Sequence, residues 1–341
     1  MSAGVGAAIE RAWYTGNPLL WLLLPLSALF WLISSLRRKG YQLGILKAYR
    51  PRARVIVVGN ISVGGNGKTP VVIALAEHYK KQGRQVGVVS RGYGGKCNTF
   101  PYRVRHDDPA DKTGDEPLLI ARRTGLPVVI DPVRARGVKA LEALGCTLII
   151  CDDGLQHYAL ARDVEIVVMD NRQCGNGKLM PMGPLREGRW RLNTVDVIVH
   201  NSGSEEPVLL DDVTTPQVAM TLSGGKLVNV NAPAESRTLT SLGATPCIAI
   251  AGIGNPARFF SQLSGQGVVL SDTMAFADHH QFVDDDIPDG LVLMTEKDAV
   301  KMHGIAHDNC WYLPVEADLP PLFYQQIDAA LSMARDDKEP S

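Results

Sequence analysis

Residues 54–70 have the sequence Arg54-Val-Ile-Val-Val-Gly-Asn-Ile-Ser-Val-Gly-Gly-Asn-Gly-Lys-Thr-Pro70. The β-branched run at 55–58 predicts a short strand that is buried on both faces. The glycines that follow let the backbone curl, so that successive N–H groups point at one anion. A helix is expected to begin behind Lys68 and Thr69, with Pro70 in its first turn, where a proline is tolerated. The stretch therefore predicts a phosphate-binding loop between a strand and a helix.

One position departs from the usual Gly-x-x-x-x-Gly-Lys-[Ser/Thr] pattern, because Ser62 stands where the first glycine is expected. The flanking sequence still fits, since apolar residues recur at helical spacing after Pro70 and Gly83 stands where that helix should end. A glycine-rich turn with a chance Gly-Lys-Thr is the simpler alternative, and this context argues against it. The residues expected to hold nucleotide phosphates are Ser62, Val63, Gly64, Gly65, Asn66, Gly67, Lys68 and Thr69.

Length and composition set the broad class of the protein. The chain has 341 residues and a formal net charge of -1. The length suggests roughly two domains, and the balanced charge gives no sign of nucleic-acid binding. The six cysteines form no Cys-x-x-Cys pair and no metal-ligand spacing. A reduced, cytoplasmic compartment is the simplest interpretation, and no obligate protein partner is evident.

The N-terminal region has a different character. No charged residue occurs between positions 12 and 36, and seven basic residues without an acid follow between Arg37 and Arg54. Such a run can span a bilayer, lie in its interface or form a buried core helix, and Pro25 would kink a spanning helix. The basic cluster suits an anionic lipid surface and places the rest of the chain on the cytoplasmic side.

Alternating strands and helices after the loop predict an α/β fold with a doubly wound, mostly parallel sheet of the P-loop kinase type. The sequence becomes polar and proline-containing after about residue 201, and a second, smaller α/β unit follows. We expect an apolar helix and basic segment at 1–50, a nucleotide-binding domain at 51–205, and a second domain at 206–341 that contributes to the active-site cleft.

Acidic residues are expected at the ligand-binding edge of this sheet. A buried strand ends at Asp152 and Asp153, and acids at this place help to hold Mg²⁺ in P-loop enzymes. Asp115 precedes a helical stretch, and a role as its N-cap is a sufficient structural explanation. The glycine-rich loop that begins at Arg91 fits phosphate contact and an ordinary flexible loop equally well. A histidine pair at His279 is more often part of a polar loop than a catalytic base.

Six motifs occur in the order found in tetraacyldisaccharide 4'-kinases, the lipid A 4'-kinases of bacteria with an outer membrane. The motifs lie at residues 60–70, 90–94, 114–117, 152–157, 276–279 and 295–300. The chain therefore resembles this family from its apolar segment to about Lys301. It differs from the family pattern at Asn66, where threonine is expected, and at Leu155, where phenylalanine is commoner. The resemblance also explains Ser62, since the family loop lacks the first glycine.

The resemblance implies transfer of the ATP γ-phosphoryl group to the 4'-hydroxyl of a tetraacyl glucosamine disaccharide 1-phosphate, which forms lipid IV(A) in lipid A biosynthesis. It implies ATP and Mg²⁺ as cofactors, a lipid as partner, and the cytoplasmic face of the inner membrane as location. It assigns the phosphates to Lys68 and its loop, the metal to Thr69, Asp152 and Asp153, and the general base to Asp115 with His279 as its orienting partner. Further candidates for phosphate or substrate contact are Arg91, Glu116, Gln156 and His157, followed by Arg134 and Glu187.

Three other functions compete with this interpretation. A P-loop ATPase that acts as a membrane-surface switch or partitioning factor often carries a lysine in place of Val63, which argues against it. A nucleotide-binding module without catalysis would leave the acids at 115 and 152 without a purpose. A soluble small-molecule kinase would leave the apolar residues 12–36 unexplained.

Overall fold

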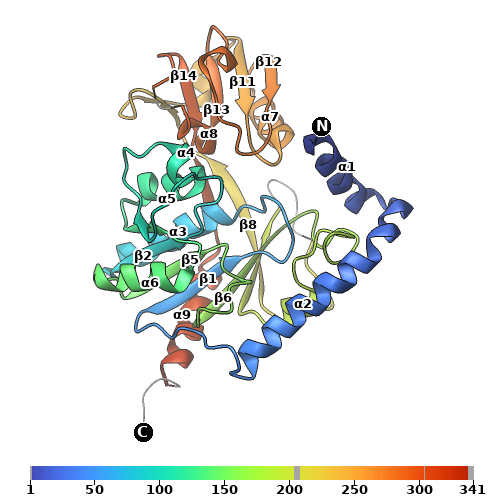
Figure 1. Cartoon of the computed structure of the whole chain (residues 1–341). Helices are drawn as coiled ribbons and strands as arrows, with labels where there is room; N and C mark the ends of the chain where they lie inside the picture. The colour runs from blue at the N-terminus through green and yellow to red at the C-terminus, as the bar shows by residue number, and fades with distance from the viewer. Residues whose placement is uncertain (1, 203–207, 303, 337–341) are drawn as a thin grey trace.

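The computed structural model describes residues 2–202, 208–302 and 304–336. In this part of the chain, two β-sheets flanked by helices lie one above the other, and two N-terminal helices run along one side (Figure 1). The larger sheet has nine strands in the order β15-β8-β7-β6-β1-β5-β2-β4-β3. The smaller sheet has six strands in the order β10-β9-β14-β13-β11-β12.

The larger sheet is mostly parallel, with antiparallel pairing at β3 and β15 on its two edges. Its strands are β1 (Arg54–Gly59), β2 (Val86–Ser90), β3 (Tyr102–Arg103), β4 (Val128–Ile130), β5 (Leu148–Asp152), β6 (Val164–Asp170), β7 (Val197–Asn201), β8 (Gln217–Gly224) and β15 (Val315–Asp318). Its helices are α3 (Lys68–Lys81), α4 (Ala110–Thr113), α5 (Asp115–Thr124), α6 (Arg134–Ala143) and α9 (Pro321–Asp336). The predicted doubly wound sheet is therefore confirmed.

Strand β1 shows why its sequence is apolar at successive positions. Ile56 and Val58 enter the core on one face of the sheet, whereas Val55 and Val57 enter the core on the other face. A strand with parallel neighbours on both sides and helices over both faces needs an apolar side chain at every position. The phosphate loop is therefore fixed to the most buried part of the sheet.

The smaller sheet forms a second unit with its own core, which includes Leu263 and Leu293. Its strands are β9 (Leu227–Asn229), β10 (Ser236–Arg237), β11 (Cys247–Ala251), β12 (Leu270–Ala275), β13 (Val292–Thr295) and β14 (Cys310–Leu313). Its helices are α7 (Pro256–Gly265) and α8 (Glu296–Ala299). The four strands from β11 to β14 run parallel, as expected for a second α/β unit.

The chain returns to the larger sheet after the second unit, which differs from the expected partition. The sequence placed residues 206–341 together, but β8 and β15 pair with each other in the larger sheet. Helix α9 also packs there, with Phe323 and Ile327 fully buried in that core. The expected boundary, between residues 205 and 206, lies within 203–207 and therefore outside the described residues. We propose residues 227–313 as the second unit, with β8 and β15 as its two connections.

The N-terminal segment forms α1 (Ser2–Thr15), a 3-10 turn at Pro18–Leu23 and α2 (Leu24–Gln42). Pro25 lies in the first turn of α2, so it does not kink the helix. The Ser27 hydroxyl donates to Leu179 O at 3.1 Å and accepts from Met182 N at 2.9 Å. Helix α2 therefore packs sideways against the body of the larger domain (Figure 1).

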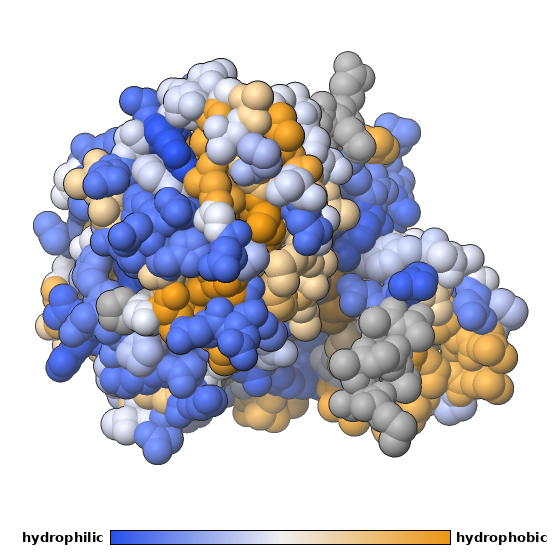
Figure 2. Space-filling model, turned by 90° about the horizontal axis from the view of Figure 1, so that it is seen from above, coloured by the Kyte–Doolittle hydropathy of each residue, from blue (hydrophilic) through white to orange (hydrophobic). Residues whose placement is uncertain are grey.

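The opposite face of α2 is apolar and uncovered. By length and composition alone, Pro18–Gln42 could cross a membrane. Leu29, Ile33 and Leu36 are each more than half exposed. Figure 2 shows hydrophobic surface at the right edge of the molecule, on the side where Figure 1 places these helices. An exposed apolar face of this extent indicates an interaction surface.

Candidate active site

A cavity of about 760 Å³ lies at the carboxyl ends of β1, β2 and β5, where ligands bind in open α/β sheets. The phosphate loop and the ends of β2 and β5 form its floor. The second unit contributes Asp278 and His279 to the wall, and α2 contributes Phe30, Ser34 and Arg37. The apolar N-terminal helix and the phosphate loop thus share one cavity.

A side-chain hydrogen bond within the loop after β1 stabilises its conformation. Ser62 is buried, and its hydroxyl accepts a hydrogen bond from Asn66 Nδ2 at 3.0 Å. Gly67 is the N-cap of α3 with φ of 86°, and a Cβ there would lie 2.3 Å from Asn201 Nδ2. The backbone conformation and the close approach both require glycine at this position. Ser62 therefore supports the loop in place of a glycine.

Lys68 reaches from the first turn of α3 into the cavity, where its Nζ lies 3.5 Å from Asp153 Oδ1. Arg186 Nη1 lies 3.1 Å from both carboxylate oxygens of Asp153. Burial raises the pKa of Asp153, but Lys68 and Arg186 together bring that pKa below its usual value. Asp153 is therefore ionised beside the phosphate loop.

Asp152 ends β5 and is almost completely buried. Its Oδ2 accepts from the Ser90 hydroxyl at 2.9 Å, while its Oδ1 has no hydrogen-bond partner among the described residues. Burial raises the pKa of Asp152 to about 7, and the charges of Glu116 and Asp153 add to the effect. A buried carboxylate oxygen without a partner, next to a phosphate loop, suits a bound cation.

The side chains near Asp152 fit Mg²⁺, which needs few protein ligands, better than they fit a metal bound only by protein side chains. The described residues contain no cluster of three or more His, Cys, Asp and Glu side chains that could hold a metal. Mg²⁺ usually takes one or two carboxylates and fills its remaining positions with phosphate oxygens and water. Asp152 and Asp153 are the two carboxylates available for this role, and Thr69 follows Lys68 in the first turn of α3.

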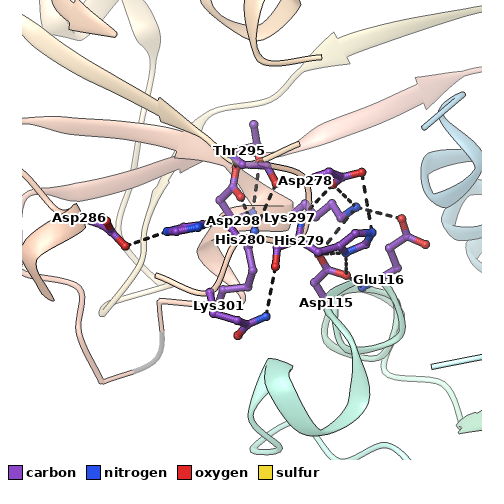
Figure 3. A network of polar contacts seen from close by, with 12 residues as sticks. Asp115, Glu116, Asp278, His279, His280, Asp286, Thr295, Lys297, Asp298 and Lys301 are labelled. Atoms are coloured by element: carbon purple, nitrogen blue, oxygen red, sulfur yellow. Dashed lines mark hydrogen bonds and ion pairs between the residues drawn. The ribbon is translucent and has the colours of Figure 1, made fainter. Parts of the chain in front are cut away.

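Asp115 and His279 form a pair across the junction of the two units (Figure 3). His279 Nδ1 lies 3.0 Å from Asp115 Oδ1 and 2.9 Å from Asp115 Oδ2. Gly114, rather than Asp115, is the N-cap of α5. The His279 ring borders the cavity, whereas Asp115 lies behind it and is 4% exposed. The geometry thus gives Asp115 a tertiary partner that a simple N-cap would not need.

The pair differs in charge. The hydrogen bond to Asp115 raises the pKa of His279, against the effect of burial. Burial raises the pKa of Asp115, but the His279 hydrogen bond and the Lys297 charge bring it below its usual value. Asp115 is therefore ionised at neutral pH, and its charge favours the protonated form of His279.

The further candidates for phosphate or substrate contact fall into two groups, those that line the cavity and those that lie outside its lining. Arg91, Glu116, Gln156 and Glu187 line the cavity. Gln156 Nε2 donates to Asn60 O and to Glu187 Oε2, both at 3.0 Å, so it fixes the wall beside the loop.

His157 and Arg134 lie outside the lining of the cavity. Arg134 is buried and donates to Asp152 O at 3.3 Å, which supports the end of β5. Burial and the charge of Arg134 lower the pKa of His157 to about 4. Both residues therefore act behind the cavity rather than in it.

Sequence reasoning missed several residues of the site. Arg186 falls in a loop that carried no recognised role, and Tyr158 follows directly after the motif at 152–157. Asp278 and Lys297 lie inside the motifs at 276–279 and 295–300, but neither was assigned a function. Their position inside these motifs was the sequence feature that could have identified them as residues of the site.

A second cavity of about 220 Å³ lies between the phosphate loop and the second unit. Apolar side chains from both units line it, namely Ile73, Leu119, Leu222, Ile253, Phe259 and Val315. Beside it, Arg258 Nη2 donates to Asn201 Oδ1 at 2.9 Å, and Asn201 Nδ2 donates to Asn66 O at 3.1 Å. These contacts link the second unit to the phosphate loop.

Comparison with known proteins gives consistent similarities. The family model for tetraacyldisaccharide-1-P 4'-kinase matches residues 19–332. The tetraacyldisaccharide 4'-kinase of Pseudoalteromonas atlantica is 48% identical over 89% of this chain and 97% of its own length. The enzyme of the same name from Tolumonas auensis is 47% identical over 96% of this chain and 98% of its own length.

A solved structure shows the same similarity in three dimensions. The crystal structure of LpxK from Aquifex aeolicus in complex with ATP aligns with a TM-score of 0.80 and 30% sequence identity. The alignment covers 92% of this chain and 99% of the other. The similarity therefore includes both sheets and the site between them.

Proposed function

The chain belongs to the tetraacyldisaccharide-1-P 4'-kinase family, and from this premise we propose which of its residues perform each part of the reaction. It is an ATP-dependent kinase that transfers the γ-phosphoryl group of ATP to the 4'-hydroxyl of a tetraacyldisaccharide 1-phosphate in lipid A biosynthesis. One observation supports the residue roles most strongly: the phosphate loop, the Asp115–His279 pair and the apolar helix α2 meet around one cavity.

We place the ATP phosphates on the backbone N–H groups of the loop and on Lys68, since Val63, Gly64, Gly65 and Lys68 line the cavity. These donors are fixed before substrate binds, so they stabilise charge on the transferring phosphoryl group without rearrangement. Arg91 and Arg186 border the same space and are suitable second donors to phosphate oxygens. When bound by Asp152, Asp153 and Thr69, Mg²⁺ supplies further neutralisation of phosphate charge.

The Asp115–His279 pair is the proposed base for the acceptor hydroxyl. Asp115 carries the negative charge that makes the pair basic, and the His279 ring holds that carboxylate from the cavity side. The pair accepts the hydroxyl proton, the hydroxyl oxygen forms a bond to the γ-phosphorus, and the bond between the γ-phosphorus and the bridging oxygen breaks to release ADP. General-base assistance of this kind contributes about 10²–10⁴-fold to a rate.

We propose the second cavity as the site of the adenosine group. Apolar side chains make up much of its wall, polar groups that include Arg258 and Lys297 complete it, and it extends from the phosphate loop to the second unit. An apolar slot with a few polar groups at its rim is the usual environment of such a ligand. Nucleotide bound here would contact both units and favour their association.

Ile253→Asp tests this placement by putting a charge into the apolar wall. We expect KM for ATP to rise about tenfold with kcat little changed, because the base binds equally in the ground and transition states. Steady-state kinetics at saturating lipid measure both constants. Val269→Asp is the control, because Val269 is 46% exposed in the same unit and lies outside the cavity lining. An unchanged KM for Ile253→Asp would contradict the placement.

The lipid substrate is proposed to enter beside α2, which lies in the membrane interface rather than across the bilayer. One side of the helix packs against the larger domain through Ser27. If the helix crossed the bilayer, this domain would therefore have to enter the lipid. The outer face of α2 can enter the acyl region while Phe30 and Arg37 face the cavity. We place this surface on the cytoplasmic side of the inner membrane, with anionic lipid contacting the basic segment.

The double variant Leu29→Ser with Ile33→Ser tests this orientation. Both side chains are exposed and lie one helical turn apart. Removal of two large apolar side chains from lipid should weaken partitioning at least about 100-fold. Flotation with vesicles that contain anionic phospholipid measures it. Leu144→Ser, at the end of α6, is a matched exposed control. Equal flotation of wild type and double variant would refute the proposed contact.

Coupling between ATP turnover and lipid phosphorylation distinguishes the kinase from a membrane-surface ATPase. For purified protein in detergent with ATP and Mg²⁺, we expect ADP to form only when the tetraacyldisaccharide 1-phosphate is present, in equal amount to phosphorylated lipid. Rapid ADP formation without lipid would favour the ATPase.

A further inference from the structure

Lys297 lies where the two units meet, among three carboxylates (Figure 3). Its Nζ is 3.1 Å from Glu116 Oε1, 3.2 Å from Asp278 Oδ1 and 3.7 Å from Asp115 Oδ2. The side chain is only 18% exposed. The ammonium group therefore lies within 4 Å of three carboxylates, two of them from α5 and one from the second unit.

The local fold fixes the position of Lys297. Strand β13 ends at Thr295 and α8 begins at the next residue. The Thr295 hydroxyl accepts from Asp298 N at 3.2 Å and donates to Asp298 Oδ2 at 2.6 Å. Asp298 is itself buried and paired with Lys301 at 2.7 Å. The turn that carries Lys297 is thus braced on its inner side, and its outer side faces α5.

The charges around Asp115 come from every element that packs against it. Glu116 is on α5, Asp278 and His279 follow β12, and Lys297 and Lys301 belong to the segment of α8. Burial lowers the pKa of Lys297, but Glu116, Asp115 and Asp278 raise it, so the ammonium stays charged. Without this charge, neighbouring carboxylates would repel one another and favour protonation of a buried Asp115.

We propose that Lys297 is a positioning residue for the catalytic base: it holds the Asp115 carboxylate ionised and turned toward His279, and it does so only while the second unit packs on α5. The inference rests on the proposed role of Asp115 as part of the base. Because Asp115 and Glu116 belong to one unit and Asp278 and Lys297 to the other, the base is assembled by the contact between them. When the two units are apart, the site is open to water. It can then hold ATP, but the base is inactive.

The test compares Lys297→Met, Lys297→Gln and Lys297→Arg with wild type and Asp115→Asn, using lipid phosphorylation across a range of pH. We expect Lys297→Met and Lys297→Gln to lower kcat about 100-fold, with a smaller rise in KM for ATP because Lys297 also borders the second cavity. The acid limb of kcat should move to higher pH, since loss of the neighbouring cation raises the pKa of Asp115. Lys297→Arg should recover most of the rate because it restores the charge. Thermal unfolding measures whether each variant is folded. If Lys297→Met does not fold, Lys297→Gln provides the test.

Arg123→Met is the matched control for simple docking of the two units. Arg123 Nη1 binds both oxygens of Glu296 on α8, at 3.0 and 2.9 Å, and this contact joins the same two helices. We expect this variant to leave the acid limb of kcat in place. The proposal is overturned if the Lys297 variants keep wild-type kcat, if they raise only KM for ATP, or if Arg123→Met shifts the pH profile equally. Full turnover of Asp115→Asn would instead refute the base itself, so the two failures are distinguishable.

Discussion

Replacing Asp115 with asparagine is expected to lower kcat about 1,000-fold while ATP binding stays intact. Asparagine keeps the size of the side chain and can still contact His279 Nδ1, which lies 2.9 Å from Asp115 Oδ2. It removes the negative charge, so the pair can no longer accept the proton of the 4'-hydroxyl. Asp115 lines neither the first cavity, which contains the phosphate loop, nor the second cavity. The defect should therefore appear in the chemical step.

Two measurements on the same samples separate these effects. Lipid phosphorylation at saturating ATP gives kcat, and calorimetric titration with a non-hydrolysable ATP analogue gives the affinity. Asp111→Asn is the control, because Asp111 lies four residues earlier and pairs at the surface with Lys96 at 3.4 Å. Near-normal kcat for Asp115→Asn, or an equal loss in Asp111→Asn, would show that the carboxylate at 115 is not part of the base.

The second large effect is expected for Lys68→Met. The Lys68 ammonium lies at the start of α3 and borders the cavity, 3.5 Å from Asp153 Oδ1. During transfer it is placed to neutralise charge on the phosphoryl oxygens, and loss of one such donor costs about 10²–10³-fold in kcat. Its removal also takes away a cation that the ATP phosphates are proposed to contact, which should weaken binding of Mg-ATP as well.

This combined loss distinguishes Lys68 from Asp115. We expect Lys68→Met to reduce both kcat and ATP affinity, whereas Asp115→Asn reduces kcat alone. Lys81→Met provides the control, since Lys81 is an exposed residue in the last turn of the same helix. If Lys68→Met bound ATP and turned over like the Lys81 variant, the phosphates would have to lie elsewhere.

The parts of the site that are local in sequence could be predicted from the sequence. The run at 55–58, the Gly-Lys-Thr at 67–69 and the two aspartates at the end of β5 each carry their signal within a few residues. The parallel sheet followed from the alternation of such runs with helices. Local apolar pattern and turn residues were sufficient for these elements.

Long-range contacts could not be predicted in this way. Asp115 and His279 are 164 residues apart, and the residues around Asp115 predicted only a helix N-terminus. The resemblance to a family suggested the pair, and the fold brings the two side chains together. Strand β15 has only four residues, Val-Glu-Ala-Asp, which is too short for its apolar–polar alternation to predict a strand, although it pairs with β8 at the edge of the sheet. Our proposal that α2 borders a membrane rests on contacts of Ser27 with residues more than 150 positions away, which the sequence did not show.

Transfer of label to one hydroxyl tests the central claim most directly. Purified protein is incubated with γ-labelled ATP, Mg²⁺ and detergent-dispersed tetraacyldisaccharide 1-phosphate, and a parallel sample contains the same lipid with its 4'-hydroxyl methylated. We expect label in the first lipid and none in the second. Label in both lipids, or hydrolysis of ATP with no label in either, would contradict phosphoryl transfer to the 4'-hydroxyl.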